Sequence, residues 1–515
     1  MQPASEAVAP GDQTLLRYLL PLSVFVSGAV VMVLEVLGTR LIAPVYGTSL
    51  HVWSAIIAVT LLSLSVGYWL GGRFADRFPR ATIYFLLFEL SALLIVLLPL
   101  VREPVLDLTM PLGLRSGALL SAILFLGLPL TLLGMISPYA VRLAAHLITD
   151  LGRITGRLYA LSTAGSLCGT LLAGFYLIPS FRLRSIFLGT ALVLCAPAAL
   201  YQALAARRQL AGAALVALAV GVSAARPVHT ASGIRHVAET QFGQLKVFDQ
   251  GGARSLLVNG TIQTQTLAGS NVALSAYPMV MSELAWRARP DGGKALLIGL
   301  GGGVLPPMLA SFGVKTRSIE VDPQVVEVAR QYFAFDPHLY PVTIADGRNY
   351  LAATNESFDY IVLDAFAGEV VPVHLLTAEM VELIDQRLAP HGILVLNYLG
   401  YRAGDQARPL RSVVRTIATR FANVVVYPSY PPGDYGNNIV LASREPIQLH
   451  GGARPFVVPP WMGDQIKIQP PLELSGSSIV LDDDYNPLDL WAVAASEKWR
   501  TAAIAMYPRE VLFAE

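Results

Sequence analysis

The sequence is poor in charge and in cysteine. Only 14% of its 515 residues are charged, whereas soluble domains carry about 25%. The net charge of +1 gives no electrostatic reason to expect nucleic acid as a partner. Both cysteines, Cys168 and Cys195, lie in apolar segments, which makes a disulfide or a metal site a poor expectation. The sequence also begins without a signal-peptide pattern, so we expect none.

The missing charge is concentrated in the first 225 residues, where long apolar runs recur. Because about 20 apolar residues suffice to cross the hydrocarbon core, these runs predict a transmembrane helical domain of six or seven spans over residues 1–226. The seventh run is the weakest, since it is short and rich in alanine. The predicted segments are 16–38, 52–72, 81–101, 117–137, 158–178, 186–205 and 209–225.

Two features of this half raise the possibility of transport. Glu89 has no local partner in its apolar segment and is expected to face a polar interior, because carboxylates at membrane depth are costly. Residues Gly71–Arg80, GGRFADRFPR, resemble the cytoplasmic loop between the second and third helices of major-facilitator transporters. A transport role rests on that analogy alone.

After residue 226 the pattern changes to strands. Residues 235–249 and 255–266 alternate in hydrophobicity, with turns at Gly251-Gly252 and Asn259-Gly260. Asn-Gly between apolar runs is a strong hairpin signal. The sequence therefore predicts a small β-domain, with a connecting helix, over residues 227–290.

Strands and helices then alternate over residues 291–515, as in a parallel, doubly wound Rossmann-like sheet of the class I methyltransferase type. The expected strands are 294–299, 314–321, 342–345, 358–363 and 392–398. The expected helices are 305–312, 323–333 and one near 377–388.

Polar chemistry is expected where these strands end. Glycines 299, 301, 302 and 303 form a turn that lets the backbone approach a ligand. Glu320 ends the next strand, where a carboxylate can bind both ribose hydroxyls, and Asp346-Gly347 and Asp364 follow the third and fourth strands. This set predicts a nucleoside site. The alternative is that such carboxylates cap helices, as expected for Asp322 before Pro323.

At these residues the chain resembles the polyamine aminopropyltransferases, the spermidine synthase family, in its membrane-fused form. The resemblance covers residues 235–445 and includes LLVNGTIQT, the glycine turn, VLDAF around Asp364 and PVHLLT. It also includes the later LDDDYNP and the N-terminal GAVVMVLEVLGTRLIAPVYGTS. It implies transfer of an aminopropyl group from decarboxylated S-adenosylmethionine to an amine, without a metal.

The resemblance also implies roles for individual residues. Gln263 would contact the tail of the donor, Glu320 its ribose and Asp346 its adenine. Asp364 would be the base that accepts a proton from the attacking amine. The remaining expected cofactor-binding residues are Gly299, Gly301, Gly303 and Gly347.

The chain departs from the family around the groups that react. The family usually carries an aspartate at the position of Gly302, which grips the aminopropyl ammonium of the donor, and a second catalytic-loop aspartate at that of Ala367. The usual Tyr-His pair is Tyr277-Pro278. Each lost charge-assisted contact is worth about 1.5–3 kcal/mol, so free putrescine is a doubtful substrate.

Four residues are expected to bind the acceptor: Tyr277, His374, Asp483 and Tyr485. His374 is either a second base or a structural donor to the backbone. The acidic run 482–484 either replaces the lost carboxylates or is simply solvated.

The leading hypothesis is thus a membrane-bound transferase. Its expected partners are a small-molecule or lipid amine, the bilayer and a second copy in a homodimer. Alternatives are an S-adenosylmethionine-dependent methyltransferase and a nucleoside-binding transporter or sensor without turnover.

Arginines between the apolar segments predict a cytoplasmic N-terminus. Seven spans would place the second half outside the cell, away from its cytosolic cofactor. We therefore expect six spans, an interfacial or re-entrant seventh segment, and a multi-pass inner-membrane protein whose soluble domain is cytoplasmic.

Overall fold

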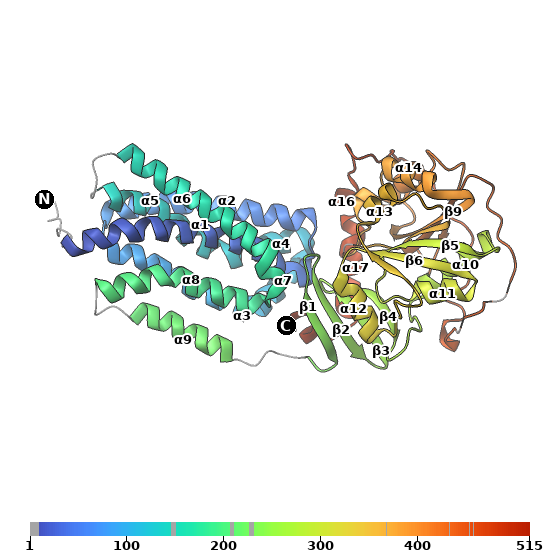
Figure 1. Ribbon diagram of the computed structural model, residues 1–515, viewed down its shortest axis with the longest axis horizontal. Coiled ribbons are helices and arrows are strands. Elements are labelled where there is room, and N and C mark those ends of the chain that lie inside the picture. Colours follow the sequence, from blue (N-terminus) through green and yellow to red (C-terminus); the bar gives the residue numbers. More distant parts are fainter. Residues whose placement is uncertain are drawn as a thin grey trace. The chain divides into compact units, whose positions relative to one another are not determined.

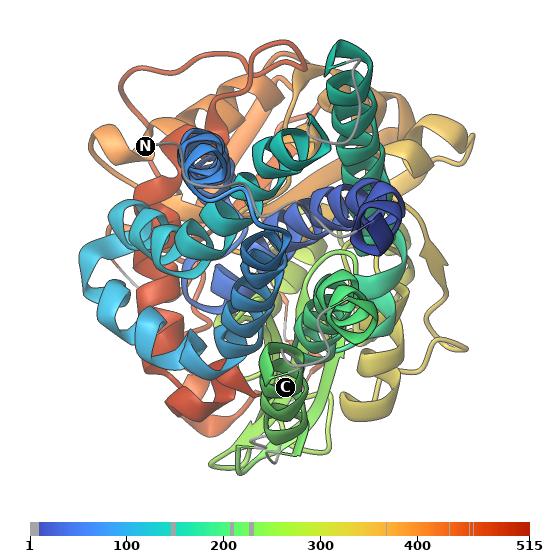
Figure 2. The same ribbon diagram turned by 90° about the vertical axis from the view of Figure 1, so that its left-hand side faces the viewer.

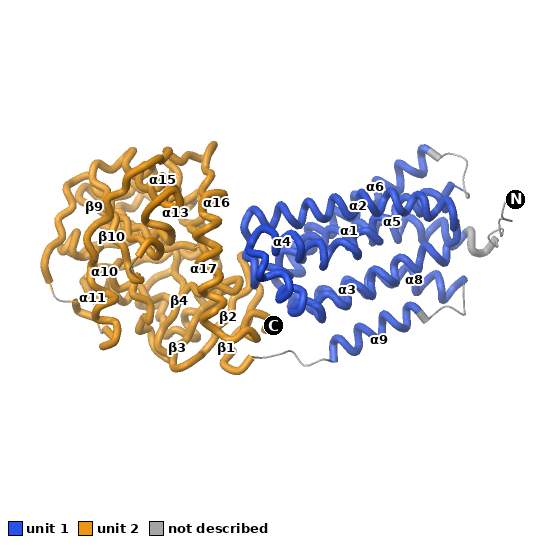
Figure 3. The backbone as a smooth tube through the Cα atoms, turned by 180° about the vertical axis from the view of Figure 1, so that it is seen from behind, with its two compact units in different colours: residues 1–229, 515 blue, residues 230–514 orange. Residues whose placement is uncertain are grey.

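The computed structural model describes residues 10–145, 151–205, 211–225, 231–366, 368–431, 433–452, 454–456 and 458–514. The chain divides into two compact units, residues 1–229 and 230–514 (Figure 3). The expected order of a helical bundle, a small β-domain and a Rossmann-like domain is confirmed (Figure 1). Ala367 lies outside the described residues.

The first unit is entirely helical in its described part, and Figure 2 looks along its helices. Its α-helices are α1 Pro10–Tyr46, α2 Leu50–Arg77, α3 Ala81–Thr109, α4 Gly113–Ala122, α5 Leu128–Ala145, α6 Leu151–Leu172, α7 Ile178–Ser180, α8 Leu183–Leu204 and α9 Ala211–Ala225. Five helical stretches of the described residues are long and apolar enough to cross a membrane. They contain five of the seven predicted segments and all but the last residue of a sixth, 186–205.

The seventh segment forms α9, which has 15 residues. At 1.5 Å per residue it is about 22 Å long, shorter than a hydrocarbon core of about 30 Å. It packs on α3 and α8. Its length agrees with an interfacial or re-entrant position, which stays a prediction.

Small residues let α1 and α6 pack at close range. A Cβ on Gly165 would lie 2.0 Å from the carbonyl oxygen of Phe25, and one on Gly169 would lie 2.3 Å from that of Ala29. Glycines four residues apart on one helix face are typical of tightly packed membrane helices.

Glu89 has the polar surroundings that were expected. Its side chain is buried on α3, accepts a hydrogen bond of 2.5 Å from Nε2 of Gln202 on α8 and accepts another from the backbone of Ala213 in α9. It therefore joins three helices and caps the start of α9, which is a structural role.

The second unit opens with a four-stranded antiparallel sheet in the order β1-β2-β3-β4. Its strands are β1 Ile234–Glu239, β2 Gln244–Gln250, β3 Ala253–Val258 and β4 Thr261–Leu267. The hairpin at Asn259-Gly260 is confirmed, since both residues have positive φ, 49° and 79°. The run 235–249 is two strands rather than one, because a turn at residues 240–243 divides it.

A seven-stranded sheet follows in the order β10-β11-β9-β8-β5-β6-β7. Its strands are β5 Gly293–Ile298, β6 Val314–Glu320, β7 Val342–Ile344, β8 Phe358–Leu363, β9 Leu388–Tyr401, β10 Asn423–Pro428 and β11 Tyr435–Ser443. The five predicted strands are present and parallel. Two further strands, β10 and β11, were not predicted, and β11 pairs antiparallel with both β9 and β10.

Helices cover both faces of this sheet (Figure 1). Alternate residues of β5 point to opposite faces: Leu296 and Ile298 pack toward α14 and α15, whereas Ala295 and Leu297 pack toward α10 and α11. The helices are α10 Ala276–Ala288, α11 Leu305–Ser311, α12 Pro323–Tyr332, α13 Gly347–Ala353, α14 Ala378–Arg387, α15 Arg408–Ile417, α16 Leu488–Trp491, α17 Val493–Ala505 and α18 Arg509–Phe513.

Candidate active site

The strand register aligns the predicted site residues along one edge of the sheet. Ile298 of β5 lies beside Ile319 of β6 and Leu363 of β8, and Leu363 lies beside Leu396 of β9. The residues that follow are Gly299, Glu320, Asp364 and Asn397. This edge is the carboxyl end of the parallel strands, where open α/β sheets bind ligands.

The glycine turn after β5 is required by the packing of the protein itself. Gly299, Gly301 and Gly303 have positive φ of 95°, 55° and 72°. A Cβ on Gly299 would lie 2.3 Å from the Asp364 carbonyl oxygen, and one on Gly303 would lie 2.4 Å from the Phe335 ring. The turn thus brings the ends of β5 and β8 together.

Gly302, where the family usually carries an aspartate, has no free space for a side chain. A Cβ there would lie 2.7 Å from Cγ2 of Thr264 and 3.1 Å from Cδ1 of Phe333. The Gly302 N–H donates a 2.8 Å hydrogen bond to Oγ1 of Thr264. An aspartate at this position would require both neighbours to move.

Glu320 at the end of β6 binds the backbone around it. Its carboxylate accepts hydrogen bonds from the N–H groups of Leu300 (3.0 Å), Val321 (2.9 Å) and Asp322 (3.0 Å). Burial raises the pKa of Glu320, although these N–H donors oppose the shift. An ionised carboxylate has about four acceptor positions, so roughly one remains for a ligand.

Asp346 is the N-cap of α13 and accepts a 2.9 Å hydrogen bond from the Asn349 N–H. Nε2 of His374 lies 3.0 Å from its other carboxylate oxygen. Burial works to raise the pKa of Asp346, but the Asn349 N–H and His374 outweigh it and hold that pKa below its usual value. Gly347, the next residue, packs against Ile298, which a Cβ would approach to 2.4 Å.

Two residues predicted to bind the acceptor contact Asp346 or its near neighbour Arg348. His374 pairs with Asp346 itself. Asp483 forms a bidentate ion pair with Arg348, at 2.7 and 2.5 Å, and this pair lowers the pKa of Asp483. Arg348 also donates to the His374 carbonyl oxygen, at 3.2 Å. The structure therefore joins His374 and Asp483 to the predicted nucleoside end.

Tyr485 and Asp322 have local structural contacts. The Tyr485 side chain is 61% exposed, and its backbone N–H donates to Asp482 at 2.6 Å. Asp322 caps α12 by accepting from the Gln324 N–H at 2.9 Å, as expected.

Asp364 is held by two side chains at the end of β8. Nδ2 of Asn397 donates to one carboxylate oxygen at 2.8 Å, and the Tyr277 hydroxyl donates to the other at 3.3 Å. Burial raises the pKa of Asp364 to about 6, although both hydrogen bonds oppose the shift. A carboxylate with a pKa near neutrality suits proton transfer at physiological pH.

The sequence did not reveal Asn397 or its neighbour Asn437. Nδ2 of Asn437 donates to Oδ1 of Asn397 at 2.9 Å, which orients the Asn397 amide toward Asp364. Asn397 interrupts an aliphatic run in β9, and that signal could have been used. Asn437 lies in β11, which was not predicted.

A cavity of about 230 Å³ adjoins this group. Tyr277 and Asn397, the two partners of Asp364, both line it, as does Gln263, whose Nε2 donates to the Gly368 carbonyl oxygen at 2.8 Å. The wall is otherwise formed mostly by apolar and carboxamide side chains: Ile262, Gln265, Leu274, Ser275, Ala276, Phe366, Leu399, Tyr430, Pro431, Asn437, Gln465, Trp499 and Met506.

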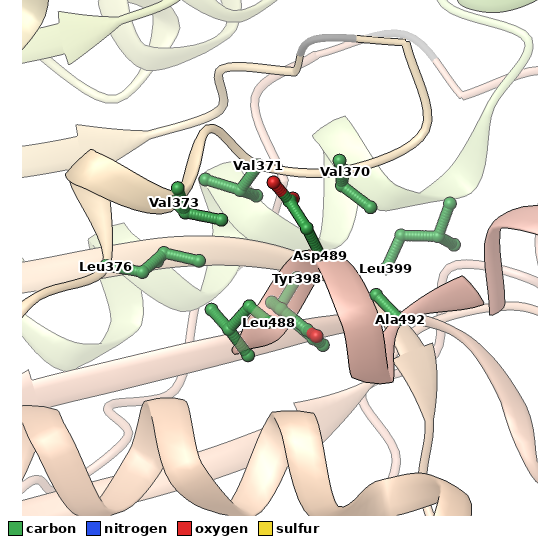
Figure 4. Close-up of a pocket in the computed structure, with 9 residues that line it drawn as sticks. All are labelled: Val370, Val371, Val373, Leu376, Tyr398, Leu399, Leu488, Asp489 and Ala492. Carbon is green, nitrogen blue, oxygen red and sulfur yellow. The ribbon is translucent and has the colours of Figure 1, made fainter. Parts of the chain in front are cut away.

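A second hollow is far smaller, about 10 Å³. Figure 4 shows that aliphatic side chains, with Tyr398 and Asp489, surround it. That volume holds about one water molecule, so of these two hollows the larger one is the candidate for a substrate. Neither His374, Asp483 nor Tyr485 lines either hollow.

Comparisons with known proteins find similarities to the second unit. Residues 275–436 match the Spermine/spermidine synthase domain. A polyamine aminopropyltransferase of Vibrio vulnificus is 31% identical over 170 residues, which are 32% of this chain and 54% of that protein. An N-terminal histidine N-methyltransferase of Emericella nidulans is 32% identical over 162 residues, 30% of this chain and 28% of that protein.

Among solved structures, a probable spermidine synthase from Corynebacterium glutamicum is 20% identical, with a TM-score of 0.36, covering 43% of this chain and 81% of that one. The chain spans about half of the length of the Vibrio relative and under a third of the Emericella one. Residues 275–436 are thus similar to the spermine/spermidine synthase domain, and these similarities concern the second unit of the chain.

Proposed function

We propose that the chain is a membrane-bound transferase that moves the aminopropyl group of decarboxylated S-adenosylmethionine to an amine. One observation carries the proposal. Asp364, with a pKa of about 6, lies between the glycine turn and a cavity large enough for a small amine.

The donor would lie over the carboxyl ends of β5, β6 and β7. The backbone of Gly299, Gly301 and Gly303 would pass beneath it, and the remaining acceptor position of Glu320 would take a ribose hydroxyl. The exposed side chains of Val321 and Ile344 (40% and 50%) adjoin Glu320 in the chain and across the β6–β7 pair, which suits a flat base. Asp346 and Gly347 would border the adenine, and Gln263 the tail.

In the reaction the amine nitrogen attacks the carbon beside the sulfonium. A C–N bond forms, the C–S bond breaks, and its electron pair stays on sulfur in methylthioadenosine. An ammonium has no lone pair, so the Asp364 carboxylate would orient the amine and accept its proton. Tyr277 and Asn397 would hold that carboxylate in place.

Methyl transfer is the second candidate, and the crowding at Gly302 favours it. The family's aspartate at this position would grip an aminopropyl ammonium, and Thr264 and Phe333 leave no room for it. The Emericella relative is named as a methyltransferase. The same nucleoside site serves either donor.

Product analysis separates the candidates. The purified full chain is incubated with an amine and with either donor, and the nucleoside product is identified by mass spectrometry. We expect methylthioadenosine from the decarboxylated donor. S-adenosylhomocysteine would support methyl transfer instead. Donor binding without either product would indicate a sensor.

We also propose that the first unit anchors the chain in the inner membrane, with the second unit in the cytoplasm, where the donor is made. Five helices of sufficient length and hydropathy support the anchoring. A reporter fused after Glu515 should be active in the cytoplasm. Activity confined to the periplasm would contradict the orientation.

A further inference from the structure

The cavity beside Asp364 is unusual for a site that binds polycations. None of the described residues that line it is Asp, Glu, Lys, Arg or His. Its polar groups are mostly carboxamides, those of Gln263, Gln265, Asn397, Asn437 and Gln465, and the rest of its wall is largely apolar. Carboxamides solvate polar groups but do not neutralise a charge.

The outer wall comes from the C-terminal part of the chain, beyond the matched domain. Trp499 of α17 and Met506, just after it, both line the cavity. Two anchors hold this segment in place. Arg500 is 2% exposed, pairs with Glu369 and donates to the Asn259 carbonyl oxygen at 3.0 Å. The Tyr507 hydroxyl donates to the Gly260 carbonyl oxygen.

This arrangement accepts one positive charge and disfavours a second. The positive charge of the attacking amine can be balanced by the Asp364 carboxylate, which Tyr277 and Asn397 hold by hydrogen bonds. A second ammonium on the same molecule would lose its hydration among apolar and amide groups, with no described carboxylate in the wall to pair with it. An acceptor whose remaining part is apolar and of the same size would instead bind more favourably, because its apolar surface is removed from water.

The volume sets the size of that body. A cavity of about 150 Å³ holds a benzene ring, and this one is about 230 Å³. It can therefore hold one ring with a short chain, or a short alkyl chain, and it is partly open to solvent beside the exposed Tyr430 and Met506.

We propose that the acceptor is a monoamine with an uncharged, mainly apolar body, and that Trp499 and Met506 determine this specificity. The inference rests on the proposed function, because it takes transfer to an amine for granted. It holds for either donor, since it concerns only the acceptor end of the site.

The test compares pentylamine with 1,4-diaminobutane, which have the same number of non-hydrogen atoms and differ in replacing a methyl group by an ammonium. The full chain is assayed with the donor that gives nucleoside product. We expect kcat/KM for pentylamine to exceed that for the diamine roughly tenfold or more. Equal values, or a preference for the diamine, would overturn the inference and leave the proposed function intact.

Substitutions test the wall directly. Trp499→Ala should lower kcat/KM for pentylamine about tenfold by removing apolar contact area, mainly through KM. Trp461→Ala is the matched control, because Trp461 is 63% exposed and does not line the cavity. Gln465→Glu, which adds a carboxylate with almost no change in shape, should shift the preference toward the diamine.

The experiments distinguish failure of the proposed function from failure of the inference about the acceptor. If no amine yields either nucleoside product, the proposed function is wrong and this inference falls with it. If product forms but Trp499→Ala and Trp461→Ala behave alike, α17 does not set specificity. If a folded Gln465→Glu variant kept the same preference between pentylamine and the diamine, the absence of a carboxylate in the cavity wall would not explain that preference.

Discussion

Replacing Asp364 by asparagine should make the protein more stable while removing the proposed transferase activity. Asparagine keeps the shape of the side chain and can still accept from Nδ2 of Asn397, which donates to Asp364 at 2.8 Å. It carries no charge and cannot accept a proton. The gain in stability and the loss of activity have one cause. The ionised carboxylate that would accept the proton is destabilised by burial, and the asparagine carries no such charge.

The size of the stability effect follows from the pKa. Burial raises the pKa of Asp364 from 3.8 to about 6, and each pKa unit corresponds to about 1.36 kcal/mol. At neutral pH the cost of the ionised carboxylate is then at most about 3 kcal/mol. Because the side chain is only partly buried, we expect a gain of about 1–2 kcal/mol in the free energy of unfolding.

The raised pKa also fixes the direction in which stability changes with pH. The folded pKa is raised, so the folded wild type holds its proton up to pH 6, whereas the unfolded chain loses it near pH 4. The wild type therefore loses stability as pH rises from about 4 to 6, and the variant does not. The gain in the free energy of unfolding of the Asp364→Asn variant over the wild type should grow between about pH 4 and 6 and stay constant above pH 6.

Thermal unfolding of the full chain in detergent, from pH 4 to 8, measures this difference. The same preparations are assayed for turnover, where loss of a general base should cost about 10²- to 10⁴-fold in kcat. A variant that is inactive but less stable at pH 7.5 would refute the burial argument. A variant that turns over normally would refute the assignment of the base.

Four further outcomes follow from the site. Turnover of the wild type should rise with pH along a limb with an apparent pKa of about 6, that of Asp364, as measured by kcat/KM against pH; a flat profile from pH 5 to 8 would argue against this base. Gly303→Ala should lower the unfolding midpoint by the equivalent of more than 1 kcal/mol, because φ is +72° and the Phe335 ring is 2.4 Å from the added carbon; an unchanged midpoint would refute it. Arg348→Gln should change stability by less than about 1 kcal/mol, since its partner Asp483 is 42% exposed; a larger loss in chemical denaturation would contradict this estimate. Lys246→Met should expose the C-terminus to proteolysis, because the buried Lys246 ammonium donates to the Val511 and Leu512 carbonyls at 2.8 and 2.7 Å; an unchanged digestion pattern would show that α18 is held by other contacts.

The residues of the predicted nucleoside end lie at strand ends that local sequence could identify. Buried aliphatic runs end at Gly299, Glu320 and Asp364, and parallel strands bring their carboxyl ends to one edge of a sheet. The positions where the predicted parallel strands end were therefore sufficient to predict that these residues lie along one edge of the sheet. The same reasoning predicted the hairpin at Asn259-Gly260, where both residues need positive φ.

The proposed acceptor end depends on contacts between distant segments, which local patterns do not specify. Tyr277 lies 87 positions from Asp364 and Asn437 lies 40 from Asn397, and α17 contributes Trp499 from farther still. The direction of β11 also decides the position of Asn437, and strand periodicity carries no information on direction. For the same reason, no local pattern indicated that His374 pairs with Asp346 and Asp483 with Arg348.

Calorimetric titration of the full chain with methylthioadenosine, the nucleoside part of the donor, tests the central claim most directly. We predict that the wild type binds it and that Asp364→Asn binds equally well. Glu320→Gln should bind about tenfold or more weakly, as expected for loss of a charged partner of the ribose. Absence of binding to the folded wild type, or equal affinity in Glu320→Gln, would contradict a nucleoside site at the glycine turn.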